Sequence, residues 1–277
     1  MSRVIYISDF LLEDIVGGGE LNDYELCKLL SDSNKEVLRI RSHDLMPDHI
    51  SESDFYIVSN FINLRSDVKA KLQSHCNYVI YEHDHKYLRS RNPALYKNYV
   101  APPDQIINKS FYEGAIKVFC QSSFHENIIN DNISLMNLHN VSGNLWSEDS
   151  LSVMRILSRK EKRDCYSILN SSIDHKNTRE TSFYCEKKGY KYDAISSNNY
   201  SEFLSLLSNN DKFIFLPKTP ETLSRVVVEA RMMNIKTFTN KRVGASYEDW
   251  FNLKGEELID LMIEKKTHIK NLFLELM

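Results

Sequence analysis

The chain has 277 residues, of which 42% are hydrophobic, and its formal net charge is −3 at pH 7. This length and apolar content suffice for one or two domains with real cores, and the near-neutral charge gives no indication of a nucleic-acid-binding surface. The five cysteines form no CxxC pair, as expected for reduced thiols in a cytosolic chain. The N-terminal "MSRVIYISDFLLED" lacks the apolar core and cleavage site of a signal peptide, and no apolar run is long enough to span a bilayer. We therefore expect a soluble, cytoplasmic protein with no transmembrane segment and no nucleic-acid partner.

Strand-like and helical stretches alternate along the first half of the chain. Leu21, Tyr24, Leu29 and Leu30 recur near helical spacing and indicate the first helix. Alternation of this kind predicts βαβ units, a parallel sheet, and ligands beyond the carboxyl ends of its strands. The other elements expected here are strands at 3–8, 36–41, 54–61, 77–83 and 117–122 and helices at 65–75, 103–115 and 123–131.

A charged run, "SRKEKRD" from Ser158 to Asp164, interrupts this alternation. A solvated helix end is one interpretation, but the alternation restarts directly after the run, which favours a linker between domains. We therefore expect an N-terminal domain at 1–157 and a C-terminal domain at 158–277, both of the α/β class. The elements expected in the second are strands at 165–170, 190–195, 212–217 and 235–240 and helices at 178–188, 199–210, 220–233 and 255–276.

Three consecutive glycines, Gly17, Gly18 and Gly19, separate the first expected strand from the first helix. Backbone amides at such a helix start carry partial positive charge and suit a phosphate. The alternative is that the glycines only form a tight turn. The pattern is not GxGxxG, so it does not indicate a dinucleotide-binding dehydrogenase.

Two glutamates stand out in "FLPKTPETLSRVVVEARMMN". Pro220 suits the first position of a helix, which would place Glu221 in the first turn and Glu229 two turns further along. Glu229 lies in an apolar context, and burying a carboxylate there requires a partner. The alternative is that both are ordinary glutamates on the helix surface.

A Glu, seven residues and a Glu-Ala pair at a helix after a strand resemble the EX7E motif of retaining GT-B glycosyltransferases, family GT4 in particular. Other segments are similar to family motifs in the same order: "GGGE", "FCQSSFHENII", "VSGNLW", "HKNT" and "VGASYED". The resemblance implies a GT-B fold, in which two Rossmann-like, doubly wound domains face a central cleft. It also implies a hexosyltransferase that moves a sugar from a nucleoside diphosphate sugar to an acceptor with retention of configuration.

The resemblance implies a role for several residues. Glu221 would contact sugar hydroxyls of the donor as a catalytic residue, and Glu229 would accept hydrogen bonds from the ribose diol. Lys176 would neutralise phosphate charge as the nucleotide leaves. Other donor-binding positions are the backbone amides of Thr222, Leu223 and Ser224 and, in the first half, the close approach allowed by Gly18 and Gly19.

A second polar cluster lies in "VIYEHDHKYLRSRNP", where the family often places a histidine that reaches the donor sugar. His83 and His85 both qualify as catalytic candidates, and a structural role for either is the alternative. Two histidines two apart also suit a metal, but no third ligand stands at ligand spacing, so we expect no metal site. Arg89 and Arg91 could hold an acceptor or a phosphate, or belong to a solvated loop.

Two departures from the family pattern keep other functions open. The arginine usually found shortly before the donor-loop lysine is replaced by Asn170, Ser171 and Ser172, and the usual Phe-Gly by Leu223-Ser224. Arg179 is a candidate replacement for the arginine. The alternatives are a catalytically degenerate binding protein for a nucleotide or glycan, or another doubly wound nucleotide-sugar or phosphate enzyme. For a transferase, we expect no cofactor, a UDP- or GDP-linked donor, and a carbohydrate, lipid-linked or small-molecule acceptor.

Overall fold

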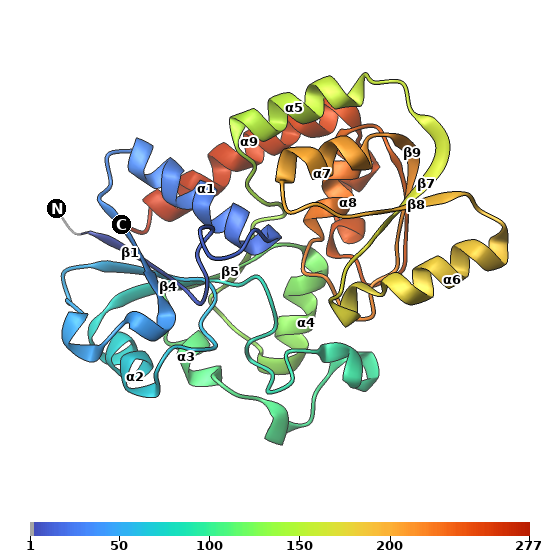
Figure 1. The fold of residues 1–277 in the computed structure, drawn as a ribbon. Helices are drawn as coiled ribbons and strands as arrows, with labels where there is room; N and C mark the ends of the chain where they lie inside the picture. Colours follow the sequence, from blue (N-terminus) through green and yellow to red (C-terminus); the bar gives the residue numbers. More distant parts are fainter. Residues whose placement is uncertain (1–2) are drawn as a thin grey trace. The chain divides into compact units, whose positions relative to one another are not determined.

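The computed structural model describes residues 3–277, and these form two compact units (Figure 1). Unit 1 contains the chain up to Leu145 together with Lys265–Met277, and unit 2 contains Trp146–Glu264. Each unit has its own parallel sheet with helices packed on it, so the α/β class expected from the alternating pattern is confirmed in both halves.

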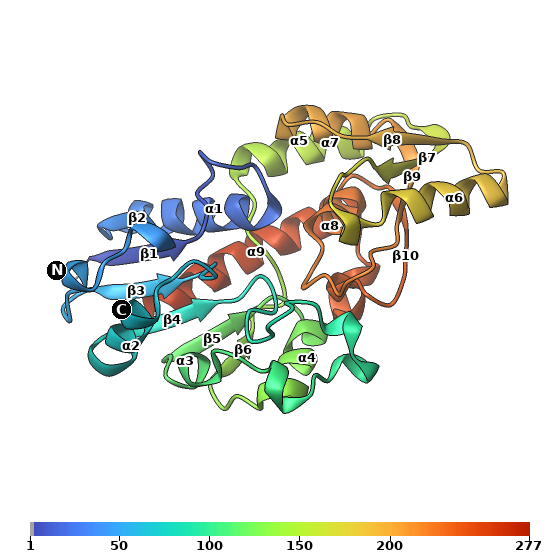
Figure 2. The ribbon, with the colours of Figure 1, turned by 60° about the horizontal axis from the view of Figure 1, so that its bottom comes forward.

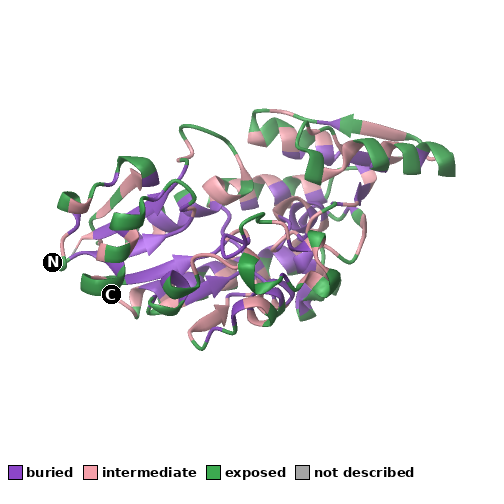
Figure 3. Ribbon diagram, turned by 90° about the horizontal axis from the view of Figure 1, so that it is seen from below, coloured by how far each residue is buried: buried purple, intermediate pink, exposed green. Residues whose placement is uncertain are grey.

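Among the described residues, six parallel strands form the sheet of unit 1, in the order β2-β1-β3-β4-β5-β6. The inner strands are buried on both faces, as the purple arrows of Figure 3 show, which is typical of a sheet covered by helices on both sides. The strands are β1 (Val4–Ser8), β2 (Val37–Arg41), β3 (Phe55–Val58), β4 (Asn77–Tyr81), β5 (Lys117–Cys120) and β6 (Leu138–Asn140).

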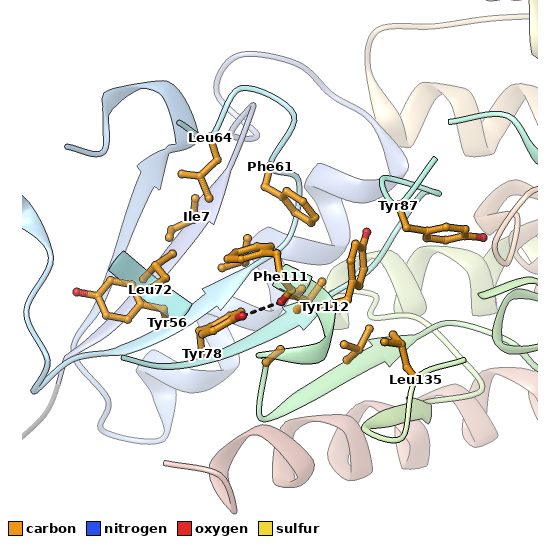
Figure 4. Packing of buried hydrophobic residues seen from close by; sticks show 14 of the residues in the cluster. Ile7, Tyr56, Phe61, Leu64, Leu72, Tyr78, Tyr87, Phe111, Tyr112 and Leu135 are labelled. Atoms are coloured by element: carbon orange, nitrogen blue, oxygen red, sulfur yellow. Dashed lines mark hydrogen bonds between the residues drawn. The ribbon is translucent and has the colours of Figure 1, made fainter. Parts of the chain in front are cut away.

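Alternate residues of these strands enter two separate cores. On one face, Ile7, Val58 and Ile80 pack against α2 (Ser66–His75), α3 (Lys109–Glu113) and α4 (Ser123–Ile133). Figure 4 shows this core, where the Tyr78 hydroxyl donates to the Phe111 carbonyl at 2.6 Å. The opposite face packs against α1 (Gly18–Asp32) and the end of α9, whose Ile269 and Phe273 are buried there.

Among the described residues of unit 2, four parallel strands have the order β10-β9-β7-β8. One face of this sheet forms the larger core with α5, α7, α8 and the start of α9, and the other packs on α6 (Figure 2). The strands are β7 (Arg163–Leu169), β8 (Tyr192–Ile195), β9 (Asn210–Phe215) and β10 (Lys236–Thr239). The helices are α5 (Glu148–Ser158), α6 (Thr178–Lys188), α7 (Tyr200–Leu207), α8 (Arg225–Met232) and α9 (Gly255–Leu274).

Short 3-10 turns complete the two units. Those of unit 1 are η1 (Ser42–Asp44), η2 (Pro47–His49), η3 (Pro93–Leu95), η4 (Lys97–Tyr99) and η5 (Pro103–Gln105). Those of unit 2 are η6 (Asp174–Lys176), η7 (Gly244–Tyr247) and η8 (Asp249–Asn252). No helix within residues 3–277 is both long and apolar enough to cross a lipid bilayer.

The unit boundary differs from the one expected at 157/158, which falls inside α5. Leu151 and Met154 of α5 are buried in the core of unit 2, so this helix belongs to the second unit and the chain changes unit at 145/146. The charged run at 158–164 connects α5 to β7 within one unit and is not the interdomain linker. The closing helix α9 contributes Leu258 to the core of unit 2, but Ile269 to that of unit 1.

Two expected helices are shorter than predicted. The stretch 103–115 contains only η5 and α3, because Asn108 takes a left-handed conformation with φ 57° between them. The helix expected from Pro220 begins at Arg225, after Ser224 with φ 73°. Glu221 instead forms a parallel bridge with Val243, and tertiary pairing thus overrides the N-terminal helix signal. β6 and α5 are additional elements that the sequence pattern did not indicate.

Candidate functional site

A close, bidentate ion pair in unit 2 joins Lys176 to Glu221. Lys176 ends η6 in the loop after β7, and its Nζ lies 2.8 Å from Oε1 and 3.0 Å from Oε2 of Glu221. Glu221 lies in the loop between β9 and α8, so both residues follow the carboxyl ends of adjacent parallel strands. Because the two side chains are 27% and 14% exposed, the pair is partly open to solvent. The structure therefore brings together two residues that sequence reasoning assigned to the donor.

Backbone contacts hold the loops that carry this pair. The Lys218 amide donates to the His175 carbonyl at 2.9 Å, and the Asn177 side chain donates to the Leu216 carbonyl at 2.7 Å. The Glu221 amide donates to the Arg242 carbonyl at 2.8 Å. These bonds connect the loops after β7, β9 and β10, so the position of the Glu221 backbone is fixed by the sheet rather than by α8.

Glu229 lies in the second turn of α8 and is 2% exposed. Its Oε1 accepts from Trp146 Nε1 at 3.0 Å and from the Tyr200 hydroxyl at 2.5 Å, and it lies 2.9 Å from Arg225 Nε. The guanidinium of Arg225 also stacks on the Trp146 ring, 4.6 Å from its centroid. Burial, and then the Glu229 charge, raise the pKa of the Tyr200 phenol well above its usual value. The carboxylate is thus buried with partners, as its apolar sequence context required.

Thr222, Leu223 and Ser224 form the segment that leads into α8. Leu223 is 1% exposed and its carbonyl accepts from the Ala245 amide at 2.8 Å, so this residue anchors the segment to the loop after β10. Ser224 precedes the helix in a left-handed conformation. Its hydroxyl is buried and has no hydrogen-bond partner among the described residues. A buried hydroxyl without a partner at a helix start is unusual and favours a bound acceptor at this position.

In unit 1, the glycine triplet forms the start of α1. Gly17 is the N-cap with φ −130° and ψ 169°, and Gly18 and Gly19 begin the helix, so none of the three requires a left-handed conformation. A Cβ on Gly17 would lie 2.4 Å from the Glu20 carboxylate, whereas a Cβ on Gly19 would meet no atom within 4 Å. The space beside Gly19 is therefore open, whereas that beside Gly17 is filled by the Glu20 carboxylate.

The face that α1 turns inward is polar near this start. The helix indicated by the spacing of Leu21 and Tyr24 is present, but Tyr24 is 41% exposed, while Asn22 and Asp23 are buried. Leu26, Cys27 and Leu30 supply the apolar contacts further along the helix, which turns the polar residues of its first turns inward.

His83 contacts this polar face. Its Nε2 lies 2.6 Å from Asp23 Oδ1, and its Nδ1 lies 2.8 Å from the side-chain amide nitrogen, Nε2, of Gln121. The Ser59 hydroxyl donates to the other Asp23 oxygen at 2.6 Å. Burial acts to raise the pKa of the Asp23 carboxyl, but His83 and Ser59 outweigh it and hold this pKa below its usual value. The His83 side chain is 11% exposed, at the carboxyl ends of β3, β4 and β5.

His85 has different surroundings. It is 1% exposed, its Nδ1 lies 2.9 Å from the Tyr87 hydroxyl, and its ring stands perpendicular to that of His125. The two candidate histidines thus point to separate sets of partners. Arg91 lies 3.3 Å from the Asp84 carboxylate as an exposed ion pair. Within residues 3–277, no group of three or more histidine, cysteine or acidic side chains is arranged to hold a metal ion.

Sequence reasoning missed five polar or aromatic partners of the candidate residues. Four of them come from elements distant in the sequence from the residue that they contact, so no local spacing relates them to it. Arg225 is the exception, because it lies four residues before Glu229 on the same helix. A second local signal was the polar pair Asn22-Asp23 directly after "GGGE", where a helix start was already expected. The missed residues are Asp23 and Gln121 beside His83, and Trp146, Tyr200 and Arg225 around Glu229.

Comparison with known proteins supports the fold. No family model and no curated protein sequence matches the chain. Sucrose-phosphate synthase from Thermosynechococcus elongatus matches with a TM-score of 0.65 at 9% identity, over 100% of this chain and 99% of that one. An E. coli trehalose-6-phosphate protein bound with UDP-2-fluoro glucose matches with a TM-score of 0.59 at 8% identity, over 99% and 98%.

A third match is an α-glucosyltransferase in complex with UDP and a 13-mer DNA. Its TM-score is 0.53 at 11% identity, over 97% of this chain and 90% of that chain. These structures are GT-B glycosyltransferases, so the chain has the GT-B fold expected from the sequence. At this level of identity the likeness is one of fold, and the cleft expected between the two domains stays a prediction.

Proposed function

We propose that this protein is a glycosyltransferase that moves a hexose-like group from a nucleoside diphosphate sugar to an acceptor, with retention of configuration. The observation that carries the proposal is the contact of Lys176 with Glu221 at the carboxyl edge of the unit 2 sheet. Ligands of open parallel sheets bind beyond this edge. The GT-B fold and the order of the sequence motifs agree with this function, and they favour the retaining class that the EX7E pattern implies.

The charges at this edge suit the chemistry of transfer. As the bond between the anomeric carbon and the phosphate oxygen breaks, its electron pair leaves with the nucleoside diphosphate, and Lys176 would stabilise the developing charge. The acceptor hydroxyl oxygen forms the new bond to the anomeric carbon and gives up its proton. In this proposal Glu221 contacts the donor sugar and Glu229 the ribose, and we assign the histidine that contacts the sugar to His83.

The start of α8 is where the diphosphate would bind. Helix amides at an N-terminus are natural donors to phosphate oxygens, and the amides of Thr222, Leu223 and Ser224 lie in the segment directly before this helix start. The buried Ser224 hydroxyl, which has no partner among the described residues, would donate to the same phosphate. This second observation supports the donor site independently of the motif. In unit 1, the start of α1 at Gly18 and Gly19 would serve the donor phosphates or the acceptor.

A catalytically degenerate binding protein is the second candidate function. Two observations favour it: positions 170–172 carry no arginine, and the Glu229 carboxylate already has three partners on one oxygen. Such a protein would bind the nucleotide but not transfer the sugar. For either function we propose a UDP- or GDP-linked ligand and a cytoplasmic protein that needs no cofactor. We propose a carbohydrate or lipid-linked acceptor rather than nucleic acid, because the net charge is −3.

Thermal unfolding with nucleoside diphosphates tests the proposal. A ligand present at a hundred times its dissociation constant should add about 2.7 kcal/mol to the free energy of unfolding. We expect UDP or GDP at millimolar concentration to raise the melting temperature, and the matching nucleoside to raise it less. A melting temperature unmoved by UDP, GDP, ADP and CDP would contradict both candidate functions. Release of free nucleotide from the sugar nucleotide on addition of acceptors then separates transfer from binding alone.

A further inference from the structure

Tyr200 contacts Glu229 from a different part of unit 2 than the other two partners. Trp146 is 1% exposed in the core, and Arg225 lies one turn before Glu229 on the same helix. Tyr200 instead begins α7 and directly follows the loop after β8, in which Ser196, Asn198 and Asn199 are exposed. Tyr200 is only partly buried where it packs against this core, so of the three the phenol is the partner that can leave the carboxylate with the smallest change to α8 and the core.

The phenol also has the chemistry of the ligand group that Glu229 would bind. An ionised carboxylate has about four acceptor positions, two on each oxygen. The contacts described above place Trp146, Tyr200 and Arg225 all on Oε1. A ribose diol held by both carboxylate oxygens would have one hydroxyl on each. Oε1 can accept a ribose hydroxyl only when one of its present donors moves away, and the hydroxyl of Tyr200 is the equivalent donor.

We propose that Tyr200 is a residue that limits the affinity of the donor site for ribonucleotides. Its hydroxyl competes with a ribose hydroxyl for Glu229 Oε1, and a ligand that supplies the full diol displaces it. A ribonucleotide therefore exchanges one hydrogen bond at Oε1 for another and gains a new one only at Oε2, whereas a nucleotide without the diol leaves the phenol in place. This inference rests on the proposed assignment of Glu229 to the ribose, and it adds to it the residue that competes with the ligand.

Calorimetric titration of the full chain with UDP and with 2′,3′-dideoxy-UDP tests the competition. Tyr200→Phe keeps the ring beside Arg225 and removes only the hydroxyl. We expect this variant to bind UDP more tightly than the wild type by about tenfold or more, the fold-change that corresponds to one hydrogen bond to a charged group. Wild-type protein should bind dideoxy-UDP more weakly than UDP. The matched control is Tyr192→Phe, whose hydroxyl lies 3.1 Å from the exposed Glu186 carboxylate, and its affinity for UDP should be unchanged.

The possible results separate this inference from the proposed function. Equal or weaker UDP binding by Tyr200→Phe overturns the competition while leaving the nucleotide site intact. Equal affinity of the wild type for UDP and dideoxy-UDP overturns the assignment of Glu229 to the ribose, and the competition with it. Failure of the wild type to bind either nucleotide overturns the proposed function for this nucleotide and therefore this inference as well. A melting temperature for Tyr200→Phe close to that of the wild type establishes that the comparison is between folded proteins.

Discussion

Lys176 and Glu221 neutralise one another at the end of two adjacent strands, with the ammonium within 3.0 Å of both carboxylate oxygens. The Lys176 ammonium also lies 5.8 Å from the centre of the Phe215 ring, which supports it from β9. A donor diphosphate would offer the lysine a second anion, and the sugar would offer the glutamate a hydroxyl. Binding of the whole donor is therefore the event that can separate the pair without leaving either charge alone.

Replacing Lys176 with methionine should weaken binding of a nucleoside diphosphate by about 10-fold or more, because a charged hydrogen bond to phosphate contributes roughly 1.5–3 kcal/mol. Binding of the nucleoside, which has no phosphate, should change much less. Calorimetry with UDP and uridine measures the difference. Lys218→Met is the matched control, since Lys218 pairs with the exposed Asp174 at the same edge of the sheet. Equal losses for nucleoside and nucleoside diphosphate would place Lys176 away from the phosphates.

Replacing Glu221 or Glu229 with glutamine should change different quantities, namely turnover for the first and nucleotide affinity for the second. Glu221→Gln should mainly lower turnover, because a group near the sugar acts where charge develops in the transition state. Glu229→Gln should weaken nucleotide affinity by about 1–3 kcal/mol, since a ribose contact is the same in ground and transition states. Steady-state kinetics and nucleotide titration distinguish the two. If neither variant changes donor binding or transfer, the EX7E interpretation is wrong.

The structure gives a different physical reason for the contrast between the two variants, and the expected result for each variant is unchanged. The sequence pattern placed both glutamates on one helix, whereas Glu221 precedes α8 and is fixed by its bridge to Val243. Glu229 has three partners, so its substitution also affects folding, and the melting temperature must accompany the kinetics. Trp146→Phe removes one of the same hydrogen bonds without touching the carboxylate, and it serves as a control for that structural component.

The local pattern predicted the parallel sheets well because buried strands and the helices between them leave strong periodic signals. It misplaced the unit boundary because a charged surface run, such as the one after Ser158, looks the same inside a domain as between domains. It missed the start of α8 because Pro220 and Glu221 are typical of a helix start, and the pairing with Val243 that overrides them is 22 positions away in the sequence. Apart from Arg225, which lies four residues before Glu229, the partners of His83 and Glu229 depend on such distant contacts, and spacing alone does not encode them.

The buried ion pair of Lys86 with Glu82 should be the most sensitive polar contact of unit 1. Both side chains are fully buried, and the same Glu82 carboxylate accepts from the Asp84 amide at 2.8 Å and from the Tyr112 hydroxyl. Lys86→Met leaves this carboxylate buried without its counter-ion and should destabilise the fold by about 3–5 kcal/mol. Because Glu82 and Asp84 flank His83, the change should also disturb that histidine. Urea denaturation followed by circular dichroism measures the loss.

Lys109→Met is the control for that substitution. It breaks a lysine–glutamate pair with the same spacing of four residues, but both of its side chains are about half exposed. Exposed pairs of this kind contribute about 0.2–1 kcal/mol, so its denaturation midpoint should stay near that of the wild type. Similar losses for Lys86→Met and Lys109→Met would show that burial does not strengthen the Glu82 pair.

Acidification should destabilise the fold through His125. This residue of α4 is fully buried against the segment that follows β4. Its Nε2 donates to the Asp84 carbonyl at 3.0 Å, and the ring lies 5.1 Å from that of His85. Burial first, and then the neighbouring His85 and Lys86 charges, lower the pKa of His125 well below its usual value of about 6.5. As the pH falls below this value, the unfolded chain binds a proton at His125 that the folded protein does not. The contribution of neutral His125 to stability is therefore fully present above about pH 6.5, and the free energy of unfolding should decrease by up to about 1.4 kcal/mol per pH unit below it.

Denaturation midpoints measured between pH 7.5 and 5 test this prediction. They should fall less steeply for His125→Gln than for the wild type, whereas substitution of the exposed His43 should leave the wild-type slope unchanged. Equal slopes for wild type and His125→Gln would mean that His125 takes up its proton in the folded protein.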